Sequence, residues 1–199
     1  MIELLLVLVS VALVVACGAF VAAEFSFVTV DRSRVDREAD EGDRRARGVR
    51  QGLRTLSTQL SAAQVGITVT NLLIGYLAQP SVASLIDAPL ESLGVSAGAV
   101  DGVALTVAFI LANAVTMIFG ELVPKNLAIA NAMGTAKAVQ GFQRGFTRII
   151  HPLVRVTNGI ANWILRRVGI EPQEELASAR SPEELTSLVR RSAEKGTLE

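Results

Sequence analysis

The sequence predicts an all-α integral membrane protein with three transmembrane helices and an amphipathic juxtamembrane belt helix. Half of its 199 residues are hydrophobic and only 19% are charged. The 19 lysines and arginines fall in two blocks, eight within residues 32–54 and eleven from residue 125 onward. Positive charge marks the cytoplasmic flanks of membrane spans. We therefore expect a multi-pass protein of the cell membrane, with its N-terminus outside and its C-terminus in the cytoplasm.

Composition also argues against several kinds of site. A single cysteine gives no disulfide framework, and a single histidine argues against a zinc site. No Ser–His or paired-aspartate arrangement is visible, so we expect no enzymatic activity. The formal net charge is zero, and no nucleic-acid partner is expected.

The first predicted span covers residues 2–30, which is long enough to cross about 30 Å of hydrocarbon as a helix. A cleaved signal peptide is the alternative. Against it, no lysine or arginine precedes the apolar run, and the run continues well past Cys17. Glu24 should face the helix bundle or a wet cavity, either as a structural acid or as a ligand.

The second predicted span covers residues 61–79, after a charged segment, residues 31–54, that we interpret as a solvated connector. Its polar residues follow helical spacing and share one face. They are Gln64, Thr68, Asn71 and Gly75. Such a stripe must face protein, water or an ion rather than lipid. It serves either as interhelical packing contacts or as a ligand surface.

Residues 80–101 contain three acids and no base, as expected of an exterior connection. The third predicted span, residues 102–124, also carries a polar stripe. Its members repeat every seven residues or lie close to the same face. They are Thr106, Asn113, Thr116 and Gly120. Two striped helices and one helix rich in small residues can therefore enclose a common polar centre.

The third span ends in a carboxylate, Glu121, followed by Pro124 and Lys125. Proline donates no backbone hydrogen bond and displaces the carbonyl four residues earlier, here that of Gly120. A carboxylate at membrane depth is costly and is by default a candidate functional group. The alternative is a kinked helix whose Glu121 pairs with Lys125 or reaches the interface.

The predicted centre is rich in oxygen and poor in nitrogen and sulfur. Hard oxygen donors suit Mg²⁺, Ca²⁺, Mn²⁺ or Na⁺ rather than zinc or copper. Broken membrane helices that present carbonyls to a cation are a recurring device of transporters. The candidate ligands are Glu121, the Gly120 carbonyl, Asn71, Asn113, Thr68, Thr116 and Ser26.

Residues 126–168 are too polar to span and form the predicted belt helix. Apolar residues from Phe142 to Ile164 make one stripe, and basic and amide residues make the other, which is typical of a helix lying in the membrane interface. Pro152 should break or bend this helix. Residues 169–199 form a cytoplasmic linker with a predicted helix at 181–195, which should lead to further cytoplasmic domains.

Three motifs give the chain a resemblance to a known family. They are Phe-Val-Ala-Ala-Glu-Phe at residues 20–25, Gln-Val-Gly-Ile-Thr with Asn-Leu-Leu-Ile-Gly at 64–75, and Gly-Glu-Leu-Val-Pro-Lys at 120–125. In this order they resemble the membrane domain (residues 1–168) of the CorC/CNNM family, whose members are linked to Mg²⁺ transport. The resemblance covers the whole chain.

The resemblance implies a homodimer in the lipid bilayer, alternating access to Mg²⁺, and regulation by cytoplasmic CBS-type domains beyond this chain. It implies that Glu121 is the acidic Mg²⁺ ligand and that Asn71 occupies a ligand position. Many relatives have serines where this chain has residues 21–23, Val-Ala-Ala. That departure leaves Ser26 or main-chain oxygens as the contribution of the first helix, and a site with fewer hydroxyls could prefer another ion such as Na⁺.

Two functions follow from this sequence. The first is a divalent-cation transporter, with Mg²⁺ as the expected ion. The alternative is an ion-sensing or scaffolding membrane module that binds the ion without moving it. Flux across a membrane distinguishes the two.

Overall fold

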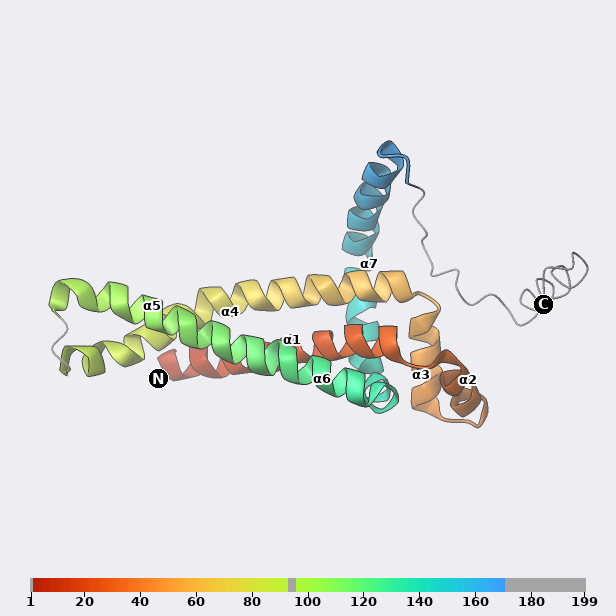
Figure 1. The fold of residues 1–199 in the computed structure, drawn as a ribbon, viewed down its shortest axis with the longest axis horizontal. Helices are drawn as coiled ribbons and strands as arrows, with labels where there is room; N and C mark the ends of the chain where they lie inside the picture. Colours follow the sequence, from red (N-terminus) through yellow and green to blue (C-terminus); the bar gives the residue numbers. More distant parts are fainter. Residues whose placement is uncertain (1, 93–95, 171–199) are drawn as a thin grey trace, which may run out of the picture. The chain divides into compact units, whose positions relative to one another are not determined.

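The computed structural model describes residues 2–92 and 96–170, and within these ranges every regular element is a helix (Figure 1). The elements are α1 (Ile2–Thr29), α2 (Arg32–Asp40), α3 (Arg44–Leu53), α4 (Leu56–Ser92), α5 (Ala97–Val115), the π-helix η1 (Thr116–Leu122), α6 (Val123–Ala130) and α7 (Ala132–Arg167). This confirms the predicted all-α fold class. Met1–Asn158 form one compact unit, and a second begins at Gly159, near the end of α7.

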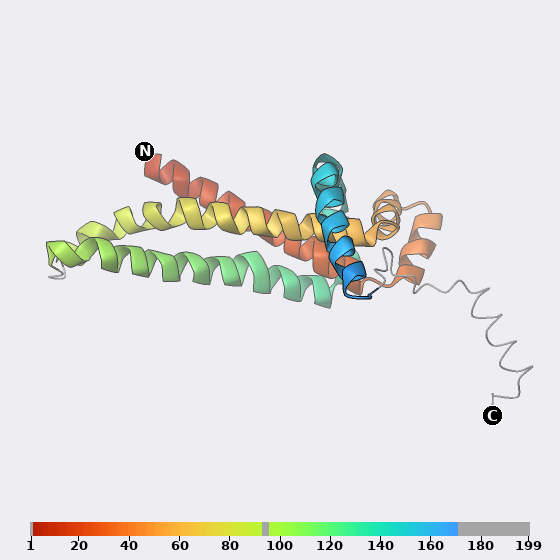
Figure 2. The same cartoon turned by 90° about the horizontal axis from the view of Figure 1, so that it is seen from above.

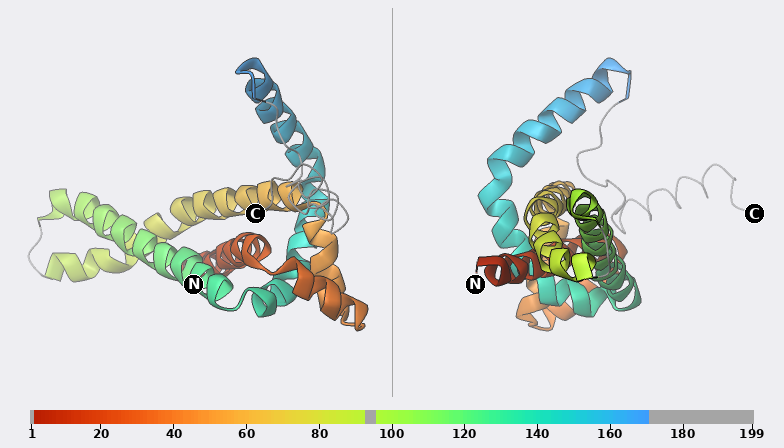
Figure 3. Two further views of the ribbon diagram at one scale, coloured as in Figure 1. Left: turned by 45° about the vertical axis from the view of Figure 1, so that its right-hand side comes forward. Right: turned by 90° about the vertical axis from the view of Figure 1, so that its left-hand side faces the viewer.

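Three segments among the described residues are long and apolar enough to cross a membrane: Leu5–Thr29, Leu56–Asp87 and Ala99–Ala130. α1 packs along α4, and α4 packs along α5 (Figures 1 and 2). α4 runs antiparallel to both, and the view along the bundle on the right of Figure 3 shows α4 and α5 next to each other. The predicted architecture of a multi-pass membrane protein is confirmed.

The second span is longer than the predicted residues 61–79. α4 continues through Pro80 and Pro89 and ends at Ser92. Residues 80–92 of the predicted exterior connection are therefore part of α4, and the side of the membrane on which they lie stays a prediction. Each proline removes one backbone donor, but membrane helices tolerate such residues where neighbouring groups satisfy the freed backbone.

Packing against α5 explains why α4 remains helical beyond its first proline. Ala83 lies in a small buried cluster with Ala104 and Ala108 of α5. The Ser81 hydroxyl donates to the Leu77 carbonyl of the same helix at 2.7 Å. Because an unwound segment would lose both this packing and its backbone hydrogen bonds, the helical state is favoured.

The third span begins before and ends after the predicted residues 102–124. α5, η1 and α6 follow one another without a break from Ala97 to Ala130. Between them the backbone pattern changes from α to π and back to α. Pro124 lies in the first turn of α6, where the absence of its N–H is best tolerated.

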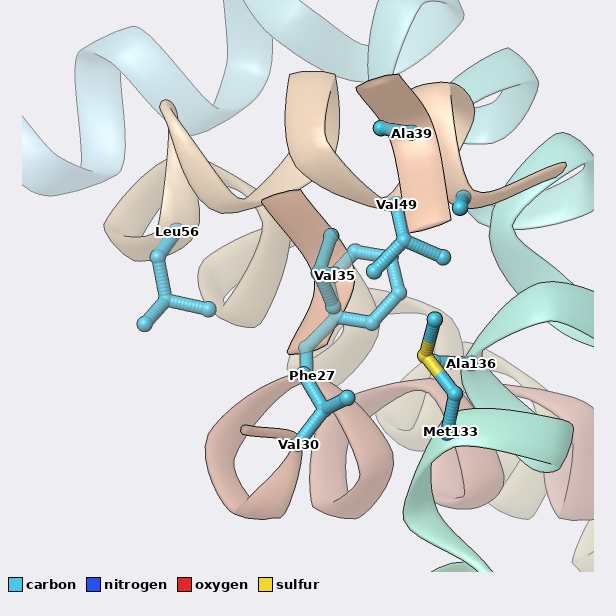
Figure 4. Close-up of a cluster of buried hydrophobic side chains, with 9 residues drawn as sticks. Phe27, Val30, Val35, Ala39, Val49, Leu56, Met133 and Ala136 are labelled. Atoms are coloured by element: carbon cyan, nitrogen blue, oxygen red, sulfur yellow. The ribbon is translucent and has the colours of Figure 1, made fainter. Parts of the chain in front are cut away.

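The charged segment between the first two spans has a core of its own. Asp31 and Asp43 cap α2 and α3, each accepting hydrogen bonds from two backbone N–H groups of the first turn. Apolar residues of both helices are buried together with the end of α1 and the starts of α4 and α7 (Figure 4). We call this cluster the junction; it comprises Phe27, Val30, Val35, Ala39, Ala46, Val49, Leu56, Met133 and Ala136. The segment predicted as a solvated connector thus consists of two capped helices, and one face of each is buried rather than solvated.

An ion network ties α7 to this junction. Lys137 of α7 bonds to Asp43 at 2.6 Å and also to Glu38, which in turn pairs with Arg34 at 2.8 Å. The hydrogen bond from Lys137 lowers the pKa of Asp43 to about 2, and the same lysine lowers the pKa of Glu38. Reciprocally, Asp43 and Glu38 raise the pKa of Lys137.

The first part of α7 also packs on the ends of α1 and α4. Phe20 of α1 contacts the rings of Phe142 and Phe146, with centroids 4.8 and 4.6 Å apart. The buried Gln143 donates to the Gln59 carbonyl at 2.8 Å. The apolar stripe of α7 therefore packs partly against α1, with the buried Gln143 beside it, and the role of this helix as a membrane-interface belt stays a prediction.

The expected break at Pro152 is absent, since α7 continues through it. The interruption lies instead at Asn131, between α6 and α7, where φ is −138° and ψ is 64°. Within the second unit, the side chains from Ile160 to Ile170 are exposed apart from Asn162. The predicted helix at 181–195 and most of the predicted linker lie outside the described residues.

Candidate cation site

A polar groove of about 490 Å³ lies among α4, α5 and η1. Four of the sequence-predicted ligand residues line it, and we define the polar groove by them: Asn71, Asn113, Thr116 and Glu121. The rest of its wall is apolar apart from backbone. The two polar stripes read from the sequence therefore converge on one space.

Glu121 and Asn71 contact each other within this groove. The Asn71 side-chain N–H donates to Glu121 Oε1 at 3.3 Å, and Asn71 Oδ1 accepts from the Cys17 thiol at 3.3 Å. This chain of contacts links α4, η1 and α1. In it the nitrogen of the Asn71 amide lies toward the carboxylate and its oxygen toward the thiol.

Glu121 has no basic partner in the described part of the chain. The four ion pairs there involve other acids. Lys125, the partner considered in the sequence-based alternative, instead lies 4.7 Å from the centroid of the Phe25 ring. The carboxylate is therefore left with one neutral hydrogen-bond donor in a largely apolar wall.

The backbone beside Glu121 is a π-helix, in which the Val123 N–H donates to the Ile118 carbonyl five residues earlier. The next bond of this series would join residue 124 to the Phe119 carbonyl, but proline has no N–H. The carbonyl that loses its donor in this pattern is therefore that of Phe119, one residue before the predicted Gly120.

Both carbonyls face α1, where Gly18 allows a close approach. A Cβ atom added to Gly18 would lie 2.9 Å from Pro124 Cγ, 3.3 Å from the Phe119 carbonyl oxygen and 3.8 Å from that of Gly120. Gly120 itself is buried against Cys17. Small residues at such crossings let membrane helices pack backbone to backbone.

Asn113 and Thr116 line the groove, and each donates one hydrogen bond within its own helix. The Asn113 amide donates to the Phe109 carbonyl and the Thr116 hydroxyl to the Ala112 carbonyl, both at 2.8 Å. Oxygen lone pairs remain on each side chain. Among the described residues no three histidine, cysteine, aspartate or glutamate side chains gather, so a cation here would be held by one carboxylate and neutral oxygens.

Thr68 and Ser26 do not line the polar groove. Thr68 is exposed, and its hydroxyl donates to the Gln64 carbonyl at 2.8 Å. Ser26 is fully buried and donates to the Ala23 carbonyl at 3.3 Å. The structure thus places both outside the group formed by Glu121 and Asn71, and their part in cation binding stays a prediction.

A second groove of about 440 Å³ adjoins the first and shares Thr116 with it. Its other lining side chains come from α1, α4, α5 and η1 and are apolar except for Ser10. An apolar wall offers a hydrated cation no replacement for its water ligands. The polar groove is therefore the better candidate for an ion.

Cys17 is the one contributor to this site that we did not predict. It is fully buried and contacts both Asn71 and Gly120. The signal was present in the sequence, since Ser10, Cys17 and Glu24 repeat every seven residues along the first helix. The Glu24 side chain is hydrogen-bonded to Gln64 of α4 and does not line the polar groove.

A family model described as "Cyclin M transmembrane N-terminal domain" matches residues 8–199. The chain belongs to this family. The resemblance to CorC/CNNM proteins inferred from the three motifs is thereby confirmed, and the described structure is that of a cyclin M membrane domain. In it, the Gly-Glu-Leu-Val-Pro-Lys motif spans η1 and the start of α6.

Several curated relatives match almost the whole chain. It is 47% identical over 193 residues to UPF0053 protein MT1890 of Mycobacterium tuberculosis, covering 97% of this chain and 42% of that protein. It is 34% identical over 193 residues to UPF0053 protein YhdT of Bacillus subtilis, with the same coverage. The chain thus spans less than half the length of these two relatives.

Where the family resemblance led us to look for hydroxyl ligands on the first helix, this member has none facing the groove. Val21, Ala22 and Ala23 are buried in helix packing. The α1 contribution near Glu121 comes instead from Cys17 and from the close approach at Gly18.

Proposed function

We propose that this chain is the membrane domain of a divalent-cation transporter and that Mg²⁺ is the ion it carries. The family is associated with divalent-cation transport. The observation that carries the proposal is Glu121, a carboxylate in a membrane-spanning segment whose hydrogen-bond partner is the Asn71 amide. An uncompensated acid at this depth is costly unless a cation binds it.

The proposed ligands are the groups that meet at the polar groove. Glu121 supplies the charge, and Asn113 and Thr116 supply neutral oxygens. Asn71 joins them by turning its amide oxygen toward the ion, which requires the contact from Cys17 to be broken. All are hard donors that suit Mg²⁺. The Gly120 carbonyl, Thr68 and Ser26 complete the predicted ligand set, and Na⁺ is the second candidate ion.

Transport requires the site to open alternately to each side of the membrane. The proposed moving contact is the crossing of α1 and η1, because Gly18 there packs on Pro124 and on the carbonyl beside the acid. A small displacement of α1 would change the ligand set of Glu121 without unfolding either helix.

We also propose a homodimer in the cell membrane, with the N-terminus outside and the C-terminus in the cytoplasm. The relatives are about twice the length of this chain. The additional length is where the proposed CBS-type regulatory domains would lie. No enzymatic activity and no nucleic-acid partner are proposed.

Substitution of Glu121 by glutamine tests the function. In proteoliposomes we expect Mg²⁺ uptake to fall to background, and we expect the rise in melting temperature with added Mg²⁺ to disappear. A direct charged ligand should change apparent affinity by at least about a hundredfold, more than a supporting residue would. Asp101→Asn, an exposed acid of α5 outside the groove, is the matched control and should leave both measurements unchanged.

The two measurements also separate the candidate functions. If Glu121→Gln leaves flux and Mg²⁺ protection intact, the proposed site is wrong. If the wild type is protected by Mg²⁺ but shows no flux, the sensing or scaffolding alternative is supported instead.

A further inference from the structure

A second pocket lies where the end of α3, the start of α4 and the middle of α7 meet, away from the polar groove. Its volume is about 450 Å³. We propose that this pocket binds the phosphate group of an anionic ligand. We call it the basic pocket; it is lined by Gln51, Thr55, Thr58, Gln59, Arg144, Thr147, Arg148, His151 and Pro152.

The charge of the pocket comes from one face of α7. Arg144 and Arg148 supply it; they are four residues apart, so their side chains leave the helix on the same side, and the imidazole of His151, which adds no formal charge, follows three residues later. Of the residues that the structure describes, no acidic one lines the pocket. None of the three takes part in the ion pairs of the described residues, which use Arg34, Arg50 and Lys137. Positive charge is thus concentrated here without a protein counter-charge.

Neutral oxygens hold the first of these side chains in place. The Arg144 guanidinium donates to Gln51 Oε1 of α3 and, at 3.1 Å, to Gln140 Oε1. Amide oxygens orient the guanidinium but do not neutralise it. Arg148, one turn further along, is exposed and makes no such contact, so its planar donor fork is available to a ligand.

The opposite wall supplies hydroxyl groups. Thr55 and Thr58 line it. The Thr55 hydroxyl donates to the Gly52 carbonyl at 3.3 Å, so Thr58 is the hydroxyl donor that this wall offers to a ligand. Guanidinium groups bind phosphate through paired N–H donors, and threonine hydroxyls commonly add further bonds. The volume and the number of donors suit a phosphate group better than a single carboxylate.

Two sources of phosphate fit this chemistry, an anionic phospholipid headgroup and a soluble phosphate. The neighbouring surface of α7 favours the lipid, because Ile149, Leu153 and Val156 are exposed apolar side chains on the same helix. A basic helix with an apolar stripe is typical of a segment at the membrane surface. Acyl chains could lie along that stripe while the phosphate occupies the pocket.

Binding of three probes to the purified chain in uncharged detergent tests the proposal. The probes are dioctanoylphosphatidylglycerol, inorganic phosphate, and dioctanoylglycerol, which lacks phosphate. We expect Arg148→Gln to weaken binding of the phosphate-bearing probe at least about tenfold. Arg155→Gln removes the same charge from an exposed site of α7 outside the pocket, and should weaken binding less than about threefold.

The outcomes distinguish a lipid headgroup, a soluble phosphate and no phosphate binding at the basic pocket. Binding of phosphatidylglycerol alone, weakened by Arg148→Gln, assigns the pocket to a lipid headgroup, and the same loss with inorganic phosphate assigns it to a soluble ligand. The proposal is overturned by no binding of either probe, by equal binding of dioctanoylglycerol, or by equal losses in both variants. Because Arg148 is exposed, its replacement should leave the melting temperature without probe unchanged.

Discussion

The acidic side chains beside the junction have basic partners, whereas the acid of the polar groove has none among the described residues. Beside the apolar junction, the acids Glu38 and Asp43 both bond to Lys137, and Glu38 also pairs with Arg34. In the polar groove, Glu121 accepts one bond from an amide. The two regions belong to the same chain and are connected by α1, yet only the first has its charges compensated.

The difference in packing follows the difference in charge. The junction buries nine apolar residues from α1, α2, α3, α4 and α7, whereas the polar groove leaves about 490 Å³ of open space beside its acid. Compensated charges around an apolar cluster stabilise a fold. A lone carboxylate next to open space stabilises nothing by itself, and its presence indicates a ligand. The comparison predicts that substitutions in the junction affect folding and that those in the groove affect binding.

The largest effect is expected from a charge placed inside the junction. Val49 is fully buried, and Val49→Asp would leave an unpaired carboxylate among apolar side chains. We expect a loss of at least about 3 kcal/mol, seen as a failure to recover monodisperse protein by size-exclusion chromatography. Arg45→Asp, on the exposed side of the same helix, should behave as the wild type. Equal stability of the two variants would contradict the buried junction.

A smaller effect is expected where α1 crosses η1. Gly18→Val introduces a Cβ atom that would lie 2.9 Å from Cγ of Pro124, in the first turn of α6, so α1 must move away from the continuous η1–α6 segment. Overpacking of this kind costs about 1–3 kcal/mol. We expect a lower melting temperature and reduced protection by Mg²⁺, both measured by thermal unfolding. Gly102→Val is the control, because a Cβ there meets nothing within 4 Å. If Mg²⁺ raises the melting temperature of Gly18→Val as much as that of the wild type, the packing of α1 at Gly18 does not affect the cation site.

The smallest effect is expected from Lys137→Met, which leaves Glu38 and Asp43 without their shared lysine. Its melting temperature should fall a few degrees below wild type at neutral pH. The pKa of Asp43 is lowered from 3.8 to about 2. Its contribution to stability is therefore present above pH 3.8 and is lost as the pH falls through about 2.

The pKa of Lys137 is raised, so its contribution is complete below its ordinary pKa and is lost only as the pH rises through the raised value. Thermal unfolding as a function of pH should thus show a difference between wild type and variant that is largest near neutrality and disappears below about pH 2. Arg155→Met, an exposed position on α7, should show no such difference. A gap that persists at the lowest pH would mean that packing, not charge, accounts for the role of Lys137.

Residue patterns within single helices were predicted well from sequence. Asn71, Asn113, Thr116 and Glu121 were identified as polar positions on two helical faces, and the structure brings them to one groove. Helical periodicity alone supports this step, because a polar side chain in an apolar span must turn away from lipid. Cys17 was missed because a thiol carries little polarity in such a pattern.

Features that depend on competition between elements were not predicted. α4 extends beyond Pro80 because alanines of α5 pack against it. The backbone before Pro124 adopts a π pattern, which periodicity cannot reveal. The burial of apolar residues within 31–54 depends on contacts with other helices. Residues of α1 and α7 provide such contacts.

Local features of the sequence were enough to show that this protein is helical, crosses a membrane, and carries an acid close to a proline in its third span. Hydropathy, charge segregation and the chemistry of proline act locally, so they can be read residue by residue. Only the tertiary structure decided which groups surround that acid. Among the described residues, Glu121 contacts Asn71 and has no basic partner because α1, α4 and η1 pack together. Contacts between such distant segments depend on that packing.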